Sequence, residues 1–354
     1  MATLYLTEQG SALGKEGQRL VVRKGDETLA DVPIIKIDQV VVFGNVSLST
    51  PALGLLMARD VDVVFLSLDG RYKGRLTGPG TGNGALRQAQ YRRSLDADFA
   101  LRTARAIVRS KLLNQHALLT WAGQVFAAWA GDARLVSERA APAASAALAD
   151  ALRRIEAVDA QAQRLHDIEA LRGLEGAGAA AYFQALKSLL RQGMGFEGRR
   201  KRPPPDPVNA MLSYGYTVLT NRMSSWVEAV GLDLYVGFFH GLKYNRPAMA
   251  LDLVEAFRAP VVDWVVLRAV NRRDLTPEDF EPGKDEEGRA TVLMTDAARA
   301  RYLTLYETRM ATKIVHPRSG NAETFARCLE LDARAMAHAI GAGTPFLAFT
   351  LPDL

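Results

Sequence analysis

The segment GRYKGRLTGPGTGNG, from Gly70 to Gly84, divides the sequence into two parts of different character. It contains six glycines, one proline and three basic side chains. Glycine and proline at this density interrupt regular secondary structure, so the pattern predicts a linker or a flexible loop. We therefore expect a domain boundary at about residue 88, with one domain at residues 1–87 and a second at residues 88–354.

The residues before this segment have the pattern of β-strands. Short runs rich in Val, Ile and Leu, of which DVPIIKIDQVVVFG (residues 31–44) is the longest, alternate with Gly, Asp and Asn. One break, residues 50–59, has helical spacing, with Ser49 or Thr50 as the cap and Pro51 in the first turn. The sequence predicts a β-sandwich-like domain that carries one short helix.

The residues after the segment are alanine-rich and follow a helical period. Leu101, Ala104, Val108 and Leu112 fall on one stripe, and residues 144–171 form another long helical stretch. Prolines and glycines then separate further helices, with a polar, acidic loop expected between Pro277 and Gly288. We predict a larger, all-α-helical domain here, and the whole chain is of the α+β class.

The composition limits the class of protein. The chain has 354 residues, of which 48% are hydrophobic and 23% charged, as is typical of soluble globular proteins. No run reaches about eighteen apolar residues, and the N-terminal residues lack a basic stretch followed by an apolar one. We expect neither export nor a membrane span. The single cysteine, Cys328, excludes internal disulfides and cysteine zinc sites, which fits a reducing cytoplasm.

Two carboxylates lie on one predicted helix, MALDLVEAFRAPVVD, after an apolar run that ends at His240. Asp252 and Glu255 are three residues apart and share a face, with Arg258 a further turn along. Carboxylates are costly to bury without a compensating cation, and an oxygen-rich site with one imidazole suits Mg²⁺ or Mn²⁺. The spacing alone equally allows both acids to face solvent, with Arg258 paired to Glu255.

A third carboxylate, Glu175, stands between glycines in GLEGAGAAAYFQAL. The small residues allow close approach of a neighbouring helix or of a DNA backbone. The alternative is an acid at a helix N-terminus, where the helix dipole favours it. Phosphodiester chemistry gives a reason to combine such groups, because carboxylates and an imidazole hold divalent ions that activate the attacking oxygen.

Clusters of basic residues suggest contacts with phosphate, although a solvated protein surface is the alternative for each. The net charge of +5 is only a mild indication of a polyanionic partner. The first cluster is the continuous run Arg199, Arg200, Lys201 and Arg202. The second alternates along the glycine-rich segment: Arg71, Lys73 and Arg75.

Together these motifs resemble one family, the CRISPR-associated adaptation nuclease, also called the spacer integrase. The resemblance runs in order through GLEGAGAAAYF, RRKRPPPDPVNAMLSYGYTVL, GLDLYVGFFH and MALDLVEAFRAPVVD, and KLLNQ (residues 111–115) also matches. It implies a β domain that dimerises and a larger α-helical catalytic domain, in a prokaryotic cytoplasm. The implied partners are a second copy of the chain, the small second CRISPR adaptation protein, and double-stranded and branched DNA.

The resemblance also implies roles for individual residues. Glu175, His240 and Glu255 match the metal ligands, with Mg²⁺ or Mn²⁺ as the cofactor, and Asp252 matches an acidic position that supports the catalytic site. Arg258 falls where the family has a basic residue near the phosphate. The implied reaction is attack of a DNA 3′-hydroxyl on a phosphodiester at the border of a CRISPR repeat, or hydrolysis when water attacks instead.

Two other functions are compatible with the same residues. In the first, the chain serves the same complex as a non-catalytic DNA-binding scaffold subunit, and the carboxylates are structural. In the second, it is an unrelated helical metalloenzyme that acts on a small phosphorylated substrate. Steep loss of DNA affinity with rising salt separates a protein that tracks phosphates from such an enzyme.

Overall fold

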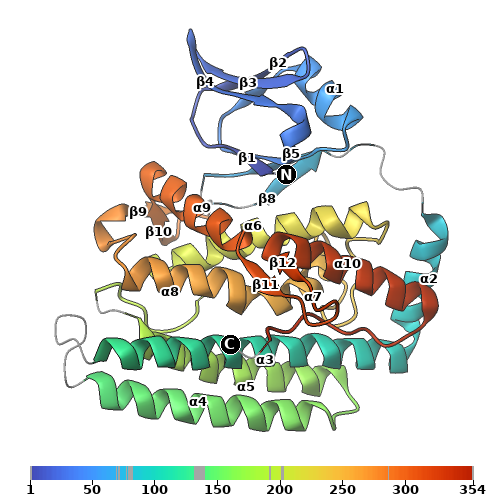
Figure 1. Cartoon of the computed structure of the whole chain (residues 1–354), viewed down its shortest axis with the longest axis vertical. Helices are drawn as coiled ribbons and strands as arrows, with labels where there is room; N and C mark the ends of the chain where they lie inside the picture. Colours follow the sequence, from blue (N-terminus) through green and yellow to red (C-terminus); the bar gives the residue numbers. More distant parts are fainter. Residues whose placement is uncertain are drawn as a thin grey trace. The chain divides into compact units, whose positions relative to one another are not determined.

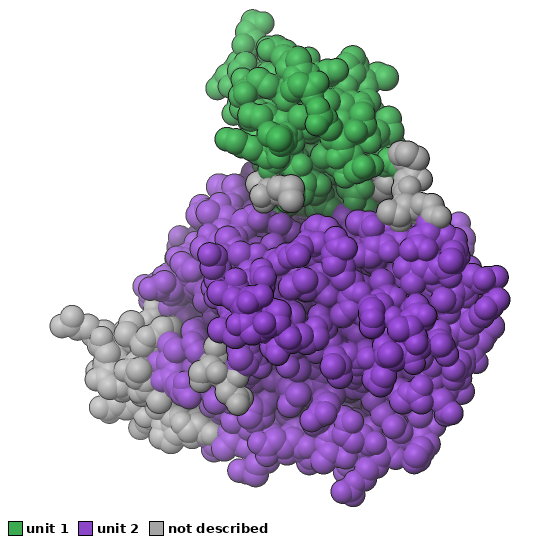
Figure 2. Space-filling view, turned by 45° about the vertical axis from the view of Figure 1, so that its right-hand side comes forward, with its two compact units in different colours: residues 1–82 green, residues 83–354 purple. Residues whose placement is uncertain are grey.

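The computed structural model describes residues 2–68, 70, 72–76, 78, 83–130, 140–190, 193–200, 203–285 and 287–352. The chain divides into two compact units, residues 1–82 and residues 83–354 (Figures 1 and 2). The division lies somewhat before the expected residue 88, because helix α2 (Gly84–Leu95) begins directly after the glycine-rich segment.

The first unit contains two four-stranded sheets and one α-helix, α1 (Thr50–Ala58), which confirms the predicted β-rich domain. Strands β1, β5 and β7 are parallel, and β8 closes that sheet in the antiparallel sense. In order, the first sheet consists of β1 (Ala2–Leu6), β5 (Ile37–Phe43), β7 (Asp62–Leu66) and β8 (Tyr72–Leu76). The second consists of β4 (Glu27–Pro33), β3 (Arg19–Lys24), β2 (Ala12–Glu16) and β6 (Ser47–Leu48).

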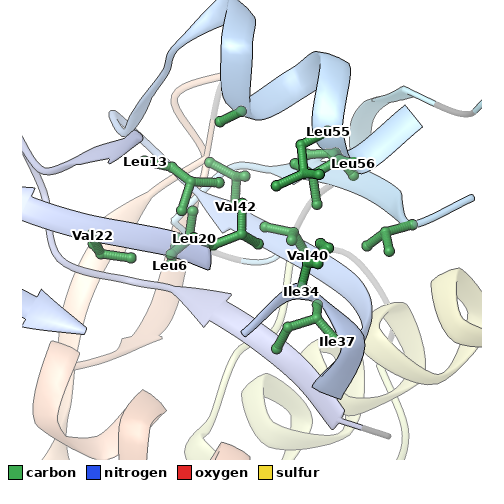
Figure 3. Close-up of a cluster of buried hydrophobic side chains, with 13 residues drawn as sticks. Leu6, Leu13, Leu20, Val22, Ile34, Ile37, Val40, Val42, Leu55 and Leu56 are labelled. Carbon is green, nitrogen blue, oxygen red and sulfur yellow. The ribbon is translucent and has the colours of Figure 1, made fainter. Parts of the chain in front are cut away.

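The core of this unit lies between the two sheets and helix α1. Figure 3 shows Val40 and Val42 of β5 among Leu13, Leu20 and Leu55. Strand β5 ends in the apolar run Val40–Phe43, whose residues are all buried, as is typical of central parallel strands. Helix α1 begins as predicted: the Ser49 hydroxyl accepts a hydrogen bond from the backbone amide of residue 52.

Part of the glycine-rich segment is a strand, so the prediction of an irregular linker was wrong for Tyr72–Leu76. These residues form β8 at the edge of the first sheet, where Gly74 pairs with Phe65. Glycine has no side chain to pack and weakens a strand, so this segment depends on its pairing with β7. The Arg75 guanidinium lies 2.6 Å from the Asp62 carboxylate, so it is held in the sheet. Arg71 lies outside the described residues.

The second unit is mostly helical, as predicted. The long helix α3 packs against α4 and α5 on one side and against α7 on the other (Figure 1). Among the described helices, none is long and apolar enough to cross a lipid bilayer. Besides α2, the helices are α3 (Ala97–Ala130), α4 (Ala140–Ala162), α5 (Ile168–Leu189), α6 (Pro207–Ala229), α7 (Ala248–Phe257), α8 (Trp264–Asn271), α9 (Asp296–Met310) and α10 (Phe325–Ala342).

Two small antiparallel hairpins amend the expectation of an all-helical domain. Strands β9 (Phe280–Lys284) and β10 (Ala290–Met294) form one of them, and β11 (Lys313–Val315) and β12 (Ala322–Thr324) form the other. The expected acidic loop is therefore partly strand. The pattern was missed because the sequence of β9, FEPGK, contains proline and glycine and has no apolar alternation.

The helix predicted around Glu255 changes its geometry after Phe257. Residues Arg258–Asp263 form a π-helical segment between α7 and α8. Pro260 lies within it and has no backbone N–H, so a regular i to i−4 ladder cannot continue there. Single-turn π segments occur often at functional sites because they reorient side chains.

A C-terminal tail follows α10 and returns to the centre of the second unit. The Phe349 ring stacks on the Phe257 ring, with 4.7 Å between the ring centroids. The backbone carbonyl of Phe349 accepts hydrogen bonds from the Ser110 hydroxyl and, at 3.1 Å, from the Asn114 amide. The Asn114 amide nitrogen also donates to the carbonyl of Ala256 at 2.6 Å. Its oxygen accepts the backbone amide of residue 351 at 2.7 Å. Asn114 thus joins α3, α7 and the tail.

Close packing of α6 leads to a stability prediction. A Cβ atom at Gly215 would lie 2.6 Å from Val262 Cγ1 and would collide with the Tyr302 hydroxyl. We expect Gly215→Ala to lower the free energy of unfolding by about 1–3 kcal/mol, the usual cost of overpacking a core. Gly173→Ala in α5 is the control, since a Cβ there meets nothing within 4 Å, and it should be neutral or stabilising. Urea denaturation measures both, and equal stabilities would contradict the prediction.

Candidate functional site

Charged side chains from three helices and one loop converge inside the second unit. Glu175 comes from α5, Lys111 from α3 and Glu255 from α7, and His240 ends the loop that precedes α7. Three of these residues were predicted site residues, and they come from distant parts of the sequence. Their convergence is the condition that the predicted metal site required.

Glu175 lies in the middle of α5, so the interpretation of this residue as an acid at a helix N-terminus was wrong. Helix α5 begins at Ile168, capped by Asp167, and continues through the glycines around Glu175. Packing explains this: Gly178 faces Leu112 of α3, and a Cβ at Gly178 would lie 2.7 Å from Leu112 Cδ2. Gly178 therefore allows close approach of α5 to α3 without ending the helix.

Both acids of α7 face the interior, so the solvent-exposed alternative was wrong. Asp252 is 1% exposed and Glu255 is 3% exposed. A buried carboxylate is tolerated only when ion pairs or hydrogen bonds compensate its charge. The two acids are compensated in different ways.

Asp252 is satisfied almost entirely by the loop before α7. It accepts backbone N–H bonds from Phe238 at 2.6 Å, from Phe239 at 3.0 Å and from His240 at 2.8 Å. Its Oδ1 also lies 2.7 Å from His240 Nδ1. Asp252 therefore fixes the orientation of the imidazole and leaves Nε2 directed at the site. In this structure Asp252 positions the imidazole of His240.

Arg172 reinforces this loop from α5. Its guanidinium donates to the carbonyl of Phe239 at 2.6 Å and 3.1 Å, one turn before Glu175 on the same helix. The peptide group between Phe239 and His240 is therefore hydrogen-bonded to both α7 and α5. Sequence reasoning did not identify Arg172, because a lone arginine in a helix has no distinguishing pattern.

Glu255 is the most strongly compensated acid of the cluster. Arg258 Nη1 lies 3.0 Å from Oε1, Lys111 Nζ lies 2.8 Å from Oε2, and His240 Nε2 lies 3.7 Å from Oε1. Burial opposes ionisation, but Arg258, Lys111 and His240 outweigh it and lower the pKa of Glu255 to about 2. Glu255 is therefore ionised at neutral pH.

Lys111 links the two acids that come from different helices. Its ammonium contacts Glu175 Oε1 as well as Glu255 Oε2. Burial disfavours the charged amine, yet Glu255 and Glu175 more than offset this and raise the pKa of Lys111. Sequence reasoning cited Lys111 only as part of the KLLNQ motif. The available signal was its place directly beside Leu112, on the apolar stripe of α3.

A second cluster surrounds Tyr216 of α6. Its ring lies 5.1 Å from the Arg258 guanidinium and 5.3 Å from that of Arg199. Its hydroxyl donates to Asp263 at 2.5 Å, and the Tyr182 hydroxyl donates to the other oxygen at 2.7 Å. Burial raises the pKa of Asp263 to about 6, although the two tyrosine hydrogen bonds act in the opposite direction. The cluster therefore packs against Arg258, which also pairs with Glu255.

The cationic run at residues 199–202 does not form one uniform surface. Arg199 turns inward, where it donates to Asn209 at 2.9 Å and to Ser213 at 3.2 Å. Burial lowers its pKa. Arg200 is exposed, and Lys201 and Arg202 lie outside the described residues. Phosphate contact at this run remains a prediction.

The predicted ligands fit a hard divalent cation in kind. Within the described residues, no group of three or more His, Cys, Asp or Glu side chains has the arrangement of a metal site. Lys111 accounts for this, because its ammonium lies between two of the predicted ligands. Glu255 Oε2 is buried, and the Lys111 ammonium lies 2.8 Å from it. Two carboxylates and an imidazole are a donor set suited to Mg²⁺ or Mn²⁺.

Comparison with known proteins identifies a matching family. The family model described as CRISPR associated protein Cas1 matches residues 4–308. A "CRISPR-associated endonuclease Cas1 2" from Rhodospirillum rubrum is 37% identical over 89% of this chain and 88% of its own length. A "CRISPR-associated exonuclease Cas4/endonuclease Cas1 fusion" from Geobacter sulfurreducens is 34% identical over 97% of this chain. The chain spans 59% of the length of that fusion protein.

Solved structures share the fold. "Casposase bound to integration product" has a TM-score of 0.80 at 22% identity, and the match covers 100% of this chain and 94% of that chain. A chain of the "Cas6-RT-Cas1--Cas2 complex" has a TM-score of 0.79 at 22% identity. That match covers 99% of this chain and 36% of the other. At these identities the likeness concerns the fold alone.

Proposed function

Because the chain belongs to the Cas1 family of CRISPR-associated proteins, we propose that it is a metal-dependent DNA endonuclease and integrase of CRISPR adaptation. The observation that carries the proposal is the buried cluster in which Glu175, His240 and Glu255 converge beside Arg258. Its groups are those that phosphodiester chemistry requires. The name of the Rhodospirillum relative supports the endonuclease activity.

Glu175, His240 and Glu255 would hold the cation. When bound, a divalent ion neutralises charge on the scissile phosphate and favours deprotonation of the attacking oxygen. The protein itself contributes orientation. Asp252 keeps the His240 ring in place through Nδ1, which leaves Nε2 for the site. Arg258 presents its guanidinium at the same edge, where it can donate hydrogen bonds to a phosphate oxygen.

The reaction is a transesterification in which one phosphodiester bond breaks and another forms. The 3′-hydroxyl of a captured DNA fragment attacks a phosphorus at the border of the repeat, and the 3′-oxygen of the cleaved strand leaves with a proton. With water as the attacking group, the same displacement is hydrolysis. Positioning and charge compensation are sufficient for this chemistry, because no covalent intermediate with the protein is needed.

The proposed partners follow from the family. We assign double-stranded and branched DNA as substrates, a second copy of this chain as the dimer partner through the first unit, and the small second adaptation protein as the companion subunit. A solved assembly with the same fold in one of its chains, the "Cas6-RT-Cas1--Cas2 complex", supports the companion. A cytoplasmic location belongs to the same proposal.

A strand-transfer assay tests the proposal. The full chain with its companion protein is incubated with a fragment bearing free 3′-hydroxyls and a plasmid that carries CRISPR repeats. We expect joined products with Mg²⁺ or Mn²⁺ and none with EDTA, because the metal supplies several kcal/mol of transition-state stabilisation. Products that persist with EDTA would exclude metal-dependent chemistry.

One observation favours a second function, a non-catalytic DNA-binding scaffold. Lys111 already compensates Glu175 and Glu255, so the acids have a structural role without any metal. The same assay separates the two functions when DNA affinity is measured beside it. DNA binding that falls steeply with salt, without joined products at any metal concentration, would support the scaffold.

A further inference from the structure

The Lys111 ammonium stands where a bridging cation would stand. Lys111 Nζ contacts Glu175 Oε1 and lies 2.8 Å from Glu255 Oε2, and the residue is only 7% exposed. These two carboxylates come from α5 and α7, so Lys111 of α3 is the group that connects the helices at this point. A divalent ion that joins the same two acids needs the same space.

The distances show why both cations cannot be present together in this place. Oxygen ligands approach Mg²⁺ or Mn²⁺ to about 2.0–2.2 Å, which is closer than an ammonium approaches a carboxylate. A divalent ion held by Glu175 and Glu255 would therefore compete with Nζ for the carboxylate oxygens that the ammonium contacts. It would also meet the full repulsion of the ammonium charge at short range.

We propose that Lys111 is a built-in competitor of the divalent cation, which must withdraw from the Glu175–Glu255 pair before the ion binds. This inference rests on the proposed function, since it takes these two acids as metal ligands. Lys111 is a positioning residue of the metal-free site. Its removal should increase the affinity of the protein for metal.

Two features make the withdrawal feasible. The distance from Lys111 Nζ to Glu255 Oε2, 2.8 Å, is the longer of its two contacts with these acids. Arg258 and His240 still compensate Glu255 when the lysine moves away. The lysine side chain has a flexible stem of four carbons, and the side chain of Glu175 is 20% exposed at the edge of the site.

The inference has a consequence for the order of binding. An ammonium displaced from two carboxylates needs another anion, and the phosphates of bound DNA are such anions. Without DNA, a metal ion therefore encounters two carboxylates whose charge Lys111 already compensates. We expect the protein to bind the metal more tightly when DNA is bound.

Mn²⁺ binding to the full chain without DNA tests the inference. Titration is followed by electron paramagnetic resonance of free Mn²⁺ or by calorimetry, for the natural protein, K111M and K111Q. We expect both variants to bind Mn²⁺ on the order of tenfold more tightly, because one unit of positive charge leaves the immediate surroundings of the ion. K111Q keeps a hydrogen-bond donor for the acids in case K111M folds poorly.

Arg109→Met is the matched control on the same helix. Its guanidinium lies 3.8 Å from Asp159 and its side chain is 56% exposed. Solvent screens an exposed charge, so the variant should bind Mn²⁺ within about twofold of the natural protein. The control separates a local effect of Lys111 from the loss of one positive charge in general.

Thermal unfolding gives a second readout that does not depend on activity. In EDTA, K111M should melt below the natural protein, because Glu175 and Glu255 lose a compensating charge. Added Mn²⁺ should raise the melting temperature of K111M more than that of the natural protein, because tighter binding to the folded state stabilises it more.

The outcomes separate this inference from the proposed function. Mn²⁺ affinities of K111M and K111Q equal to or below that of the natural protein, with binding lost in E255Q, would overturn the competition and leave the metal site in place. If the natural protein, K111M and E255Q all bind Mn²⁺ with the same weak affinity, the metal site itself is wrong.

Discussion

Glu255→Gln should reduce strand transfer and DNA hydrolysis by roughly a thousandfold or more. The change removes the charge of the acid that meets Arg258, Lys111 and His240, while it keeps the size of the side chain. Metal ions supply several kcal/mol to phosphoryl transfer, and about 4 kcal/mol corresponds to a factor of about a thousand in rate. Because the pKa of Glu255 is about 2, this charge is present throughout the neutral range.

The measurement is the rate of product formation at saturating Mg²⁺ or Mn²⁺, beside DNA affinity and thermal unfolding. Glu156→Gln is the matched control, since that side chain is 66% exposed and pairs only with the partly exposed His116 in the contacts observed. The control should retain its full rate. A rate for Glu255→Gln within tenfold of the natural protein, in a folded variant that binds DNA, would remove Glu255 from the catalytic machinery.

Asp252→Asn should affect both stability and metal binding. The carboxylate is buried. It accepts hydrogen bonds from three backbone amides, and it lies within hydrogen-bond distance of the His240 imidazole. An asparagine amide would direct N–H groups at these donors. We expect the free energy of unfolding to fall by about 3–5 kcal/mol, as for a broken buried ion pair. Loss of a group that orients a metal-binding histidine typically costs about 10- to 100-fold in metal affinity.

Urea denaturation and Mn²⁺ titration measure these two effects. Asp296→Asn is the control, because that side chain is 74% exposed and pairs with Arg299 at the start of α9. Its effect on stability should remain within about 0.5 kcal/mol. An Asp252→Asn protein as stable as the control would show that the loop before α7 does not depend on this acid. Unchanged Mn²⁺ affinity would show that His240 does not need Asp252 for its orientation.

Much of the fold is readable from local patterns, because those patterns reflect local physics. The apolar run of β5 and the Ser49 cap of α1 depend only on burial and capping within a few residues. The strand at Tyr72–Leu76 was missed for the opposite reason. Its residues form a strand because they pair with β7, and the local sequence, which is rich in glycine, gives no sign of that pairing.

The site was only partly readable. Resemblance brought Glu175, His240 and Glu255 together, and the spacing of Asp252 and Glu255 placed both on one face of a helix. The partners of these acids could not be predicted. Asp252 is held by backbone amides whose direction depends on the loop conformation, and a lysine in a helix usually indicates solvent exposure. Lys111 departs from that rule because two acids from other helices surround it.

The tail after α10 lies beyond residue 308, where the family match ends, and it still contacts the helices that carry the candidate site. Asn114 holds this tail to α3 and to the carbonyl of Ala256, one residue from Glu255, and Lys111 stands one turn earlier on α3. Residues 349 and 351 of the tail therefore help to hold α3 and α7 together beside the candidate site. A protein shortened to the residues of the family match would lack these contacts of the tail. Affinity tags are therefore better attached at the N-terminus.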